Sequence, residues 1–211
     1  MTFSLGSAPR SLVKYNDQSI SAITEIAASA KDDMVLIETI TADGSGTTVT
    51  FDSDIDSTYP IYLFKFINVH PATDAQSFTV NFRDGSTAYD ATKTTTWFQT
   101  YHTEGGASGS VSYEASYDLA QGTGEQTLIY QLGNGNDECV SGYLYLFNPS
   151  STTFVKHYLV TSDGSRWNDL QQQYFISGYA NTTSAVDAIQ FNLSSGSIDS
   201  GTIKLYGIKD S

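Results

Sequence analysis

A strict alternation of side chains near the end of the sequence limits what this chain can fold into. Within Ser197–Ile208, Ile203 and Leu205 share one side with Gly207, and the intervening residues occupy the other side. Successive side chains of a β-strand point to opposite faces, so we predict a strand here whose Ile203/Leu205 face is buried. Gly201 is expected where a turn leads into the strand, because glycine accepts a positive φ. A strand so near the terminus is expected to be ordered by pairing within a sheet that earlier segments supply.

Segments of the same kind recur from Met34 onward, each bounded by residues that favour turns. The predicted strands cover residues 34–41, 47–51, 59–69, 76–83, 92–102, 111–117, 127–130, 141–147, 152–161, 174–179, 188–193 and 197–208. Hairpins are predicted for the first two strands and for 141–147 with 152–161. Short strands at regular spacing are typical of a sandwich or jelly roll. We therefore predict an all-β, antiparallel, jelly-roll-like β-sandwich of about 11–12 strands over residues 34–211.

The longest predicted strand, residues 59–69, is apolar on both faces. One face carries Tyr62, Phe64 and Phe66, and the other carries Ile61, Leu63, Lys65 and Ile67. A strand of this kind is expected at the centre of a sandwich or at an interface. Pro71 is expected to end it, because proline has no N–H to donate to a neighbouring strand.

Residues 1–33 differ from the rest of the sequence, because their apolar residues follow no sustained period. Ile20 and Ile23 have helical spacing, and Asp17 or Ser19 could cap a short helix there. An extended arm is the other interpretation of the same residues. In either form we predict an N-terminal docking arm that contacts a partner through apolar side chains. These are Phe3, Leu5, Leu12, Val13, Tyr15, Ile20, Ile23 and Ile26.

The charge balance excludes two classes of partner. The chain contains 23 acidic and 10 basic residues, which gives a net charge of −13. Phosphate binding needs clustered Lys and Arg, so neither nucleic acid nor an anionic membrane surface is an expected partner. No secretion signal and no apolar stretch of about 18 residues is present, which predicts a protein made and soluble in a cytoplasm, with no membrane insertion. Cys139 is the single cysteine, so no disulfide is expected within the chain.

No residue pattern matches a known catalytic or metal-binding motif. The three histidines lack the spacing of metal ligands. They are His70, His102 and His157. Asp52, Asp54 and Asp56 alternate, and an extended chain would present them on one side, as in a Ca²⁺ site or a solvated acidic turn. We predict no cofactor and no enzymatic activity.

Aromatic residues are the better candidates for recognition. Tyr and Trp give rigid, amphipathic contact area that suits protein interfaces and stacking on sugar rings. Those near loops or on strands of mixed polarity are Trp97, Trp167, Tyr113, Tyr117, Tyr174 and Tyr179. In a sandwich of this size many of them would belong to the core, so each taken alone is more often a packing residue than a recognition residue.

Several turn and strand segments resemble a group of virion proteins from tailed bacteriophages, especially marine phages. The segments are Asn68–Asp74, Leu146–Thr153, Asn181–Ala185, Ala188–Phe191 and Gly201–Ile208. The resemblance extends from about residue 34 to the end. It implies a jelly-roll-like virion component, often repeated by symmetry on the capsid or the tail. The matched motifs are structural, so no functional residue carries over.

Two functions are expected from these observations. The first is a structural virion protein, either capsid decoration or a tail-fibre or adaptor-associated protein. It would dock on the capsid or tail through residues 1–33, with other virion proteins and copies of itself as partners. The second is a receptor-recognition module of a tail fibre that binds host-surface glycan. The sequence has no heptads and no repetitive shaft pattern, which argues against a fibre shaft.

Overall fold

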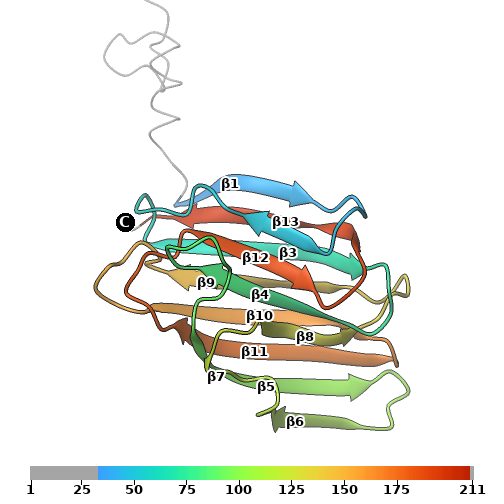
Figure 1. Cartoon of the computed structure of the whole chain (residues 1–211). Coiled ribbons are helices and arrows are strands. Elements are labelled where there is room, and N and C mark those ends of the chain that lie inside the picture. The colour runs from blue at the N-terminus through green and yellow to red at the C-terminus, as the bar shows by residue number, and fades with distance from the viewer. Residues whose placement is uncertain (1–32, 210–211) are drawn as a thin grey trace, which may run out of the picture.

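The computed structural model describes residues 33–209, and these residues form 13 antiparallel strands without a helix (Figure 1). The predicted all-β, antiparallel class is confirmed. The strands are β1 (Met34–Thr41), β2 (Thr48–Phe51), β3 (Ile61–Pro71), β4 (Gln76–Arg83), β5 (Lys93–Thr103), β6 (Gly109–Tyr113), β7 (Ala120–Gly122), β8 (Gln126–Leu132), β9 (Val140–Phe147), β10 (Lys156–Arg166), β11 (Leu170–Ala180), β12 (Ala188–Leu193) and β13 (Ile198–Ile208). The docking arm and the possible helix predicted for the N-terminal segment fall on residues 1–32, outside the described residues.

Eight of these strands form two four-stranded sheets that face each other, and one pairing between β10 and β8, Arg166 opposite Leu132, joins the two at an edge. The first sheet has the order β1-β13-β3-β9, and the second has the order β2-β12-β4-β8. When the eight strands are numbered along the chain, the two orders become 1-8-3-6 and 2-7-4-5. Each sheet therefore interleaves strands from both ends of the sequence. This is the strand order of a jelly roll, in which Greek-key connections wrap two antiparallel sheets around one core.

Two insertions extend the first sheet beyond β9. The pair β10–β11 lies between β9 and β12 in the sequence, and the segment β5–β7 lies between β4 and β8. They continue the sheet in the order β9-β10-β11-β5, and β6 and β7 both pair with the remaining edge of β5. The resulting large sheet is eight strands wide, against four strands in the second sheet that packs on it (Figure 1).

Aromatic rings fill the space between the two sheets. Phe191 of β12 stacks on Phe78 of β4 at 5.7 Å, and the rings of Phe64 and Phe66 on β3 lie 5.7 and 6.3 Å from Phe191. The inward faces predicted from alternation are confirmed for β2 and β13, and on β3, predicted to be apolar on both faces, the inward face is the one that carries Tyr62, Phe64 and Phe66. Their buried residues are Val49, Phe51, Tyr62, Phe64, Phe66, Ile203 and Leu205.

The predicted hairpin between the first two strands is wrong. β1 pairs with β13 and β2 pairs with β12, so these sequence neighbours lie in different sheets. Their connecting turn is held by β13, because the N–H groups of Ala42 and Gly44 donate to the carbonyls of Gly201 and Ile198. The turn residues correctly predicted that the chain reverses direction at this point. They could not predict which strands pair, because the partners of β1 and β2 come from the other end of the sequence.

The second predicted hairpin is confirmed in its pairing, and its second strand is longer than predicted. β9 and β10 pair as expected, but β10 begins at Lys156 and runs to Arg166. A turn at Trp167–Asp169 then joins β10 to β11 in unbroken register, from Lys156 opposite Ala180 to Arg166 opposite Leu170. The ends of β10 and β11 next to this turn are polar, so hydrophobic alternation did not predict them as strand. They are held in strand form by pairing with each other.

The strand count and one strand end also differ from the prediction. The short strand β7 was not predicted, and the total is 13 instead of 11–12. β3 includes Pro71, which lies opposite Ile198 as the last residue of the strand. Proline is tolerated there because the strand needs no further donor beyond it.

Candidate interaction surface on the large sheet

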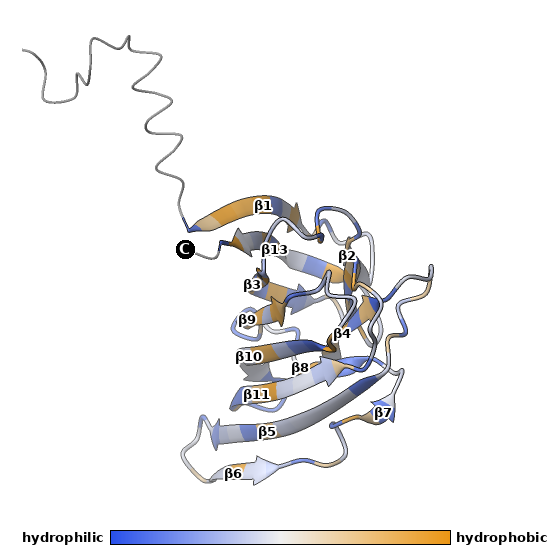
Figure 2. Cartoon of the chain, turned by 90° about the vertical axis from the view of Figure 1, so that its left-hand side faces the viewer, coloured by the Kyte–Doolittle hydropathy of each residue, from blue (hydrophilic) through white to orange (hydrophobic). Residues whose placement is uncertain are grey.

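The large sheet is covered on one face only in the described part of the chain. The second sheet packs on its inner face, and the opposite face, here called the outer face, is open (Figure 2). Ten large hydrophobic side chains are exposed among residues 33–209, and eight of them belong to the outer face. These eight are Met34, Leu36, Ile67, Phe98, Val111, Tyr113, Tyr143 and Leu159. Such a concentration of exposed apolar side chains is typical of surfaces that contact another molecule.

Strand register arranges many of the outer side chains in two continuous rows. The first row crosses from β1 to β10 and contains Leu36, Tyr206, Leu63, Tyr145 and Leu159. The second row crosses from β13 to β6 and contains Lys204, Lys65, Tyr143, Thr161, Phe175, Phe98 and Tyr113. Side chains directly opposite each other on neighbouring strands are within contact distance, so each row forms a nearly continuous surface.

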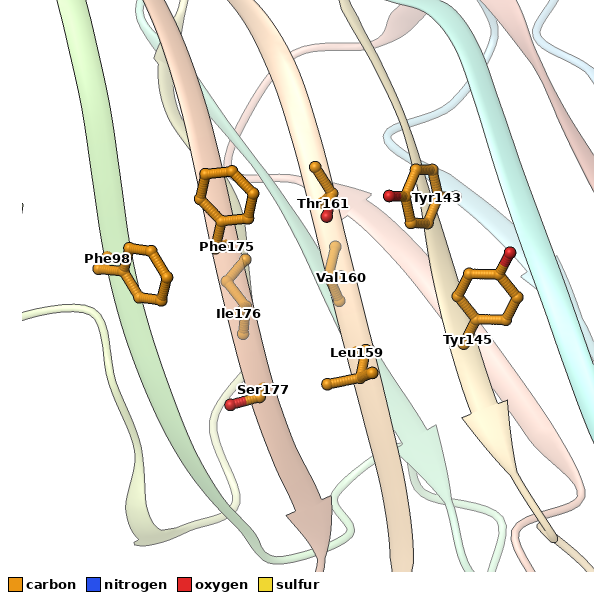
Figure 3. Close-up of a pocket in the computed structure, with 9 residues that line it drawn as sticks. All are labelled: Phe98, Tyr143, Tyr145, Leu159, Val160, Thr161, Phe175, Ile176 and Ser177. Carbon is orange, nitrogen blue, oxygen red and sulfur yellow. The ribbon is translucent and has the colours of Figure 1, made fainter.

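A shallow hollow of about 400 Å³ lies where the two rows cross β9, β10, β11 and β5 (Figure 3). Its lining residues are Phe98, Tyr143, Tyr145, Leu159, Val160, Thr161, Phe175, Ile176 and Ser177. Phe98 and Phe175 stack at 5.2 Å, and Tyr143 and Tyr145 meet edge to face at 5.5 Å. The lining is mainly apolar, and its hydroxyl groups supply the polar partners. The hollow therefore suits an apolar side chain or a sugar ring better than an isolated charge.

A second hollow of about 300 Å³ adjoins the first, and Leu159 and Ser177 line both. It continues toward the start of β5, past Tyr179 and His157, whose rings lie 5.7 Å apart. The two hollows together form a groove that crosses β10 and β11. Both strands of this groove belong to an insertion, so the jelly-roll core alone would not contain it.

The charge of the outer face differs from that of the rest of the molecule. Residues 33–209 carry 19 acidic and seven basic side chains. The two rows hold two lysines and no acidic residue, and the next outward row adds one exposed carboxylate, Asp163 of β10, opposite Ser141 and Gln173. Lys65 and Lys204 lie directly opposite each other on β3 and β13. Neither has a carboxylate within 4.0 Å in the described part of the chain, and Lys65 Nζ lies 5.3 Å from the ring centroid of Tyr206. Like charges opposite each other destabilise a sheet, so fold stability does not explain this pair.

The structure divides the six predicted aromatic residues into two groups. Three are buried or packed against the core: Trp97, Tyr117 and Tyr174. Three others are exposed or half-buried at the surface: Tyr113, Tyr179 and Trp167. Of these, Tyr113 and Tyr179 lie on the outer face, and Trp167 lies in the turn between β10 and β11.

Sequence reasoning missed most of the residues that line the hollow. Tyr143 and Tyr145 alternate with Leu144 and Leu146, so β9 is apolar on both faces. The same signal was noticed in β3, where it predicted a central strand or an interface. Applied to β9, the same signal would have predicted an apolar outer face. Only one face of a strand can pack into the core of a sandwich, so the second apolar face lies on the outside.

The histidines and the alternating aspartates form no metal site among residues 33–209, where no three His, Cys, Asp or Glu side chains are grouped closely enough. His70, at the end of β3, instead contacts β13 and the loop before β9, with Nδ1 2.6 Å from Asp199 Oδ1 and Nε2 3.1 Å from the Gly135 carbonyl oxygen. The other two histidines are exposed on the large sheet: His102 and His157.

Asp56 accepts a hydrogen bond from the Thr58 N–H at 2.7 Å, and its bonds with Thr58 lower the pKa of the carboxyl. Between the two interpretations of this segment, the acidic turn fits the structure.

Cys139 lies half-buried just before β9, with Sγ 3.8 Å from Asn68 Oδ1. Burial, followed by the charge of Asp163, raises the pKa of the thiol. The thiolate is the nucleophilic form of cysteine, so these surroundings make Cys139 less reactive than a free cysteine.

No protein-family model matches the chain, and no match was found among the curated proteins. Residues 33–209 contain no helix with the length and apolar character needed to cross a membrane. The geometry of the outer face is therefore the observation on which a functional assignment depends.

Proposed function

We propose that this protein is a structural component of a tailed-bacteriophage virion, whose jelly-roll body packs on other virion proteins or on copies of itself. The observation that carries the proposal is the open, apolar outer face of the large sheet. Monomeric proteins in water rarely expose contiguous apolar patches larger than a few hundred Å². Aromatic enrichment with few charges is the composition of the central part of a protein interface.

The insertions support a role for this face in assembly. Phe98, Val111 and Tyr113 come from β5 and β6, and Leu159 comes from β10. Half of the exposed large hydrophobic residues of the outer face are thus supplied by strands that the jelly-roll core does not need. These strands are not needed to complete the core, yet they expose apolar side chains. A contact with another molecule best explains why they do so.

The segments that resemble phage virion proteins lie in the core and its loops. Gly201–Ile208 falls in β13, Ala188–Phe191 in β12 and Asn68–Asp74 at the end of β3 and the loop that follows. Jelly rolls occur in viral capsid proteins and also in lectins. The fold is therefore compatible with both expected functions, and the extent of the apolar face favours assembly.

Quantitative mass spectrometry of purified phage particles tests the proposal. The protein is expected in the particles at a fixed ratio to the major capsid protein. A ratio set by the capsid lattice would assign it to capsid decoration, and a ratio set by tail symmetry would assign it to the tail. Particles that lack the protein, produced in cells that contain it, would refute a structural role.

The predicted N-terminal arm has its own test. Removing residues 1–30 is expected to leave a folded body, with the circular dichroism of the intact chain, that is no longer incorporated into particles. Replacing Leu12 and Val13 by serine in the full chain should weaken incorporation in the same direction. Normal incorporation of the truncated chain would show that docking does not need the arm.

A second candidate function is binding of host-surface glycan. The specific observation is the hollow of about 400 Å³, because its aromatic rings and hydroxyl groups are the groups that protein sites use for sugars. Glycan-array binding by the full-length protein is expected to disappear when Tyr143 and Tyr145 are replaced by alanine. An array that stays blank at high protein concentration argues against this candidate.

A further inference from the structure

We infer that the outer face of the large sheet binds the acidic surface of a second copy of this chain, in a head-to-tail contact. This inference rests on the proposed function and names the partner of the outer face. In a head-to-tail contact, two different surfaces of the same protein meet, and repetition of the contact gives a closed ring or a filament. The first surface is the outer face with Lys65 and Lys204, and the second is formed by acidic residues elsewhere on the molecule.

The outer face is large enough for a stable contact. Eight strands about 4.8 Å apart span roughly 34 Å, and the outward positions extend about 20 Å along the strands. The product is about 700 Å², close to the roughly 800 Å² that each partner contributes to a standard protein interface. A glycan in the hollow would leave most of this area uncovered, whereas a second protein would cover it.

The distribution of charge selects a copy of this chain as the occupant. The two rows of the outer face carry Lys65 and Lys204, and the neighbouring outward row carries the carboxylate of Asp163. Residues 33–209 as a whole carry 19 acidic and seven basic side chains, so carboxylates are a much larger share of the rest of the molecule. Two outer faces packed on each other would bring four lysines to one interface. An outer face packed on another part of the next copy brings the lysines to carboxylates, which lowers the repulsion on both sides.

The acidic surface shows repulsion that such a contact would relieve. Asp52, Asp54 and Asp56 are exposed side chains of the loop that follows β2, and Glu38 of β1 lies near Asp54 and Asp52. Burial raises the pKa of Glu38, and the charges of Asp54 and Asp52 raise it further. Among residues 33–209, two neighbouring lysines without an ion-pair partner lie on one surface and a group of exposed carboxylates lies on another, which are complementary charges for a head-to-tail contact.

The test measures the oligomeric state of the full-length protein by analytical ultracentrifugation over a range of concentrations. The variant carries both Lys65→Glu and Lys204→Glu. This double reversal replaces one like-charge pair by another, so the repulsion between positions 65 and 204 within the sheet stays similar. The charge that the outer face presents to a partner changes sign. The matched control is Lys209→Glu, which changes charge outside the two rows of the outer face.

The wild-type chain and the Lys209→Glu control are expected to associate with similar dissociation constants. The double reversal should raise the dissociation constant at least about tenfold. Leu159→Glu places a charge on the apolar part of the same face, at an exposed position that the fold tolerates, and should weaken association by a similar factor. Each variant is checked for unchanged circular dichroism.

A wild-type chain that stays monomeric at every concentration would overturn the inference, as would association unaffected by both outer-face variants. A monomer whose Lys65 and Lys204 bind an acidic polysaccharide would also overturn it, in favour of the glycan. These results are distinct from failure of the proposed function. A monomeric protein that is nevertheless present in purified particles would retain the structural role with a different virion protein as its partner.

Discussion

Lys93, at the start of β5, is a fully buried lysine in a protein with few basic residues. Its Nζ donates to Asn81 Oδ1 at 2.5 Å and to the Ala91 carbonyl at 2.7 Å. Burial lowers its pKa to about 8 from the ordinary value of 10.5, because the charged amine loses its hydration. Both acceptors are uncharged, and the charges of Asp90, Asp84 and Glu125 offset only part of this loss.

Lys93 makes stability depend on pH between neutral and moderately alkaline conditions. The folded protein binds the proton more weakly than the unfolded chain, so stability rises as pH increases from 7 toward 9, by about 1 kcal/mol. Lys93→Met removes this rise, because no titrating amine remains at the position. Urea denaturation at pH 7 and pH 9 measures the effect, and Lys204→Met on the open sheet should keep the wild-type dependence. An equal rise in the Lys93 variant would contradict the assignment.

Gly201 has a φ of +112° inside β13, at an irregularity in the pairing with β3. A Cβ at this position would lie 2.6 Å from the Asn68 carbonyl oxygen and from Val69 Cα. Gly201→Ala is therefore expected to cost at least about 2 kcal/mol, measured as the free energy of unfolding. Gly124→Ala is the control, since its Cβ would meet no atom within 4 Å. Similar stabilities of the two variants would mean that β3 and β13 approach less closely than described.

At the scale of the element, β10 shows how one strand serves both the core and the outer face. Val160 points inward and is 3 % exposed, whereas its neighbour Leu159 points outward and is 48 % exposed. Val160→Ala should cost about 2 kcal/mol of unfolding free energy through the cavity that it leaves. Leu159→Ala should change stability by less than about 0.5 kcal/mol at a concentration where the protein is monomeric. A larger loss of unfolding free energy for Leu159→Ala than for Val160→Ala would mean that Leu159, and not Val160, faces the core.

At the scale of the whole molecule, buried tyrosines limit stability at high pH. Burial, together with the hydrogen bond to Asp56, raises the pKa of Tyr62 to about 12, and burial also raises the pKa of Tyr158 and Tyr174. A folded-state pKa above the unfolded value of 10 favours the protonated phenol in the folded state. This contribution is complete below pH 10 and is lost as pH rises toward 12. We expect cooperative unfolding in this window, followed by circular dichroism and by the ultraviolet absorbance of tyrosinate.

Tyr158 offers a direct check of this alkaline transition. Its hydroxyl is buried and has no hydrogen-bond partner among the described residues. Tyr158→Phe removes an unsatisfied polar group and a titrating phenol, so stability at neutral pH should stay equal or rise by about 1 kcal/mol. The alkaline midpoint should move to higher pH. A variant that unfolds at lower pH than the wild type would show that the hydroxyl has a partner after all.

By itself, the sequence determined the all-β class, most strand positions and the inward faces of β2 and β13, because alternation and turn residues act within a few positions of each other. It did not determine that β1 joins β13 or that β2 joins β12, since those partners are remote in the sequence and are chosen when the two sheets close on one core. The outer face was decided by tertiary structure for the same reason. Lys65, Tyr143, Phe175 and Phe98 come from four strands, and only the register of the large sheet places them in one row.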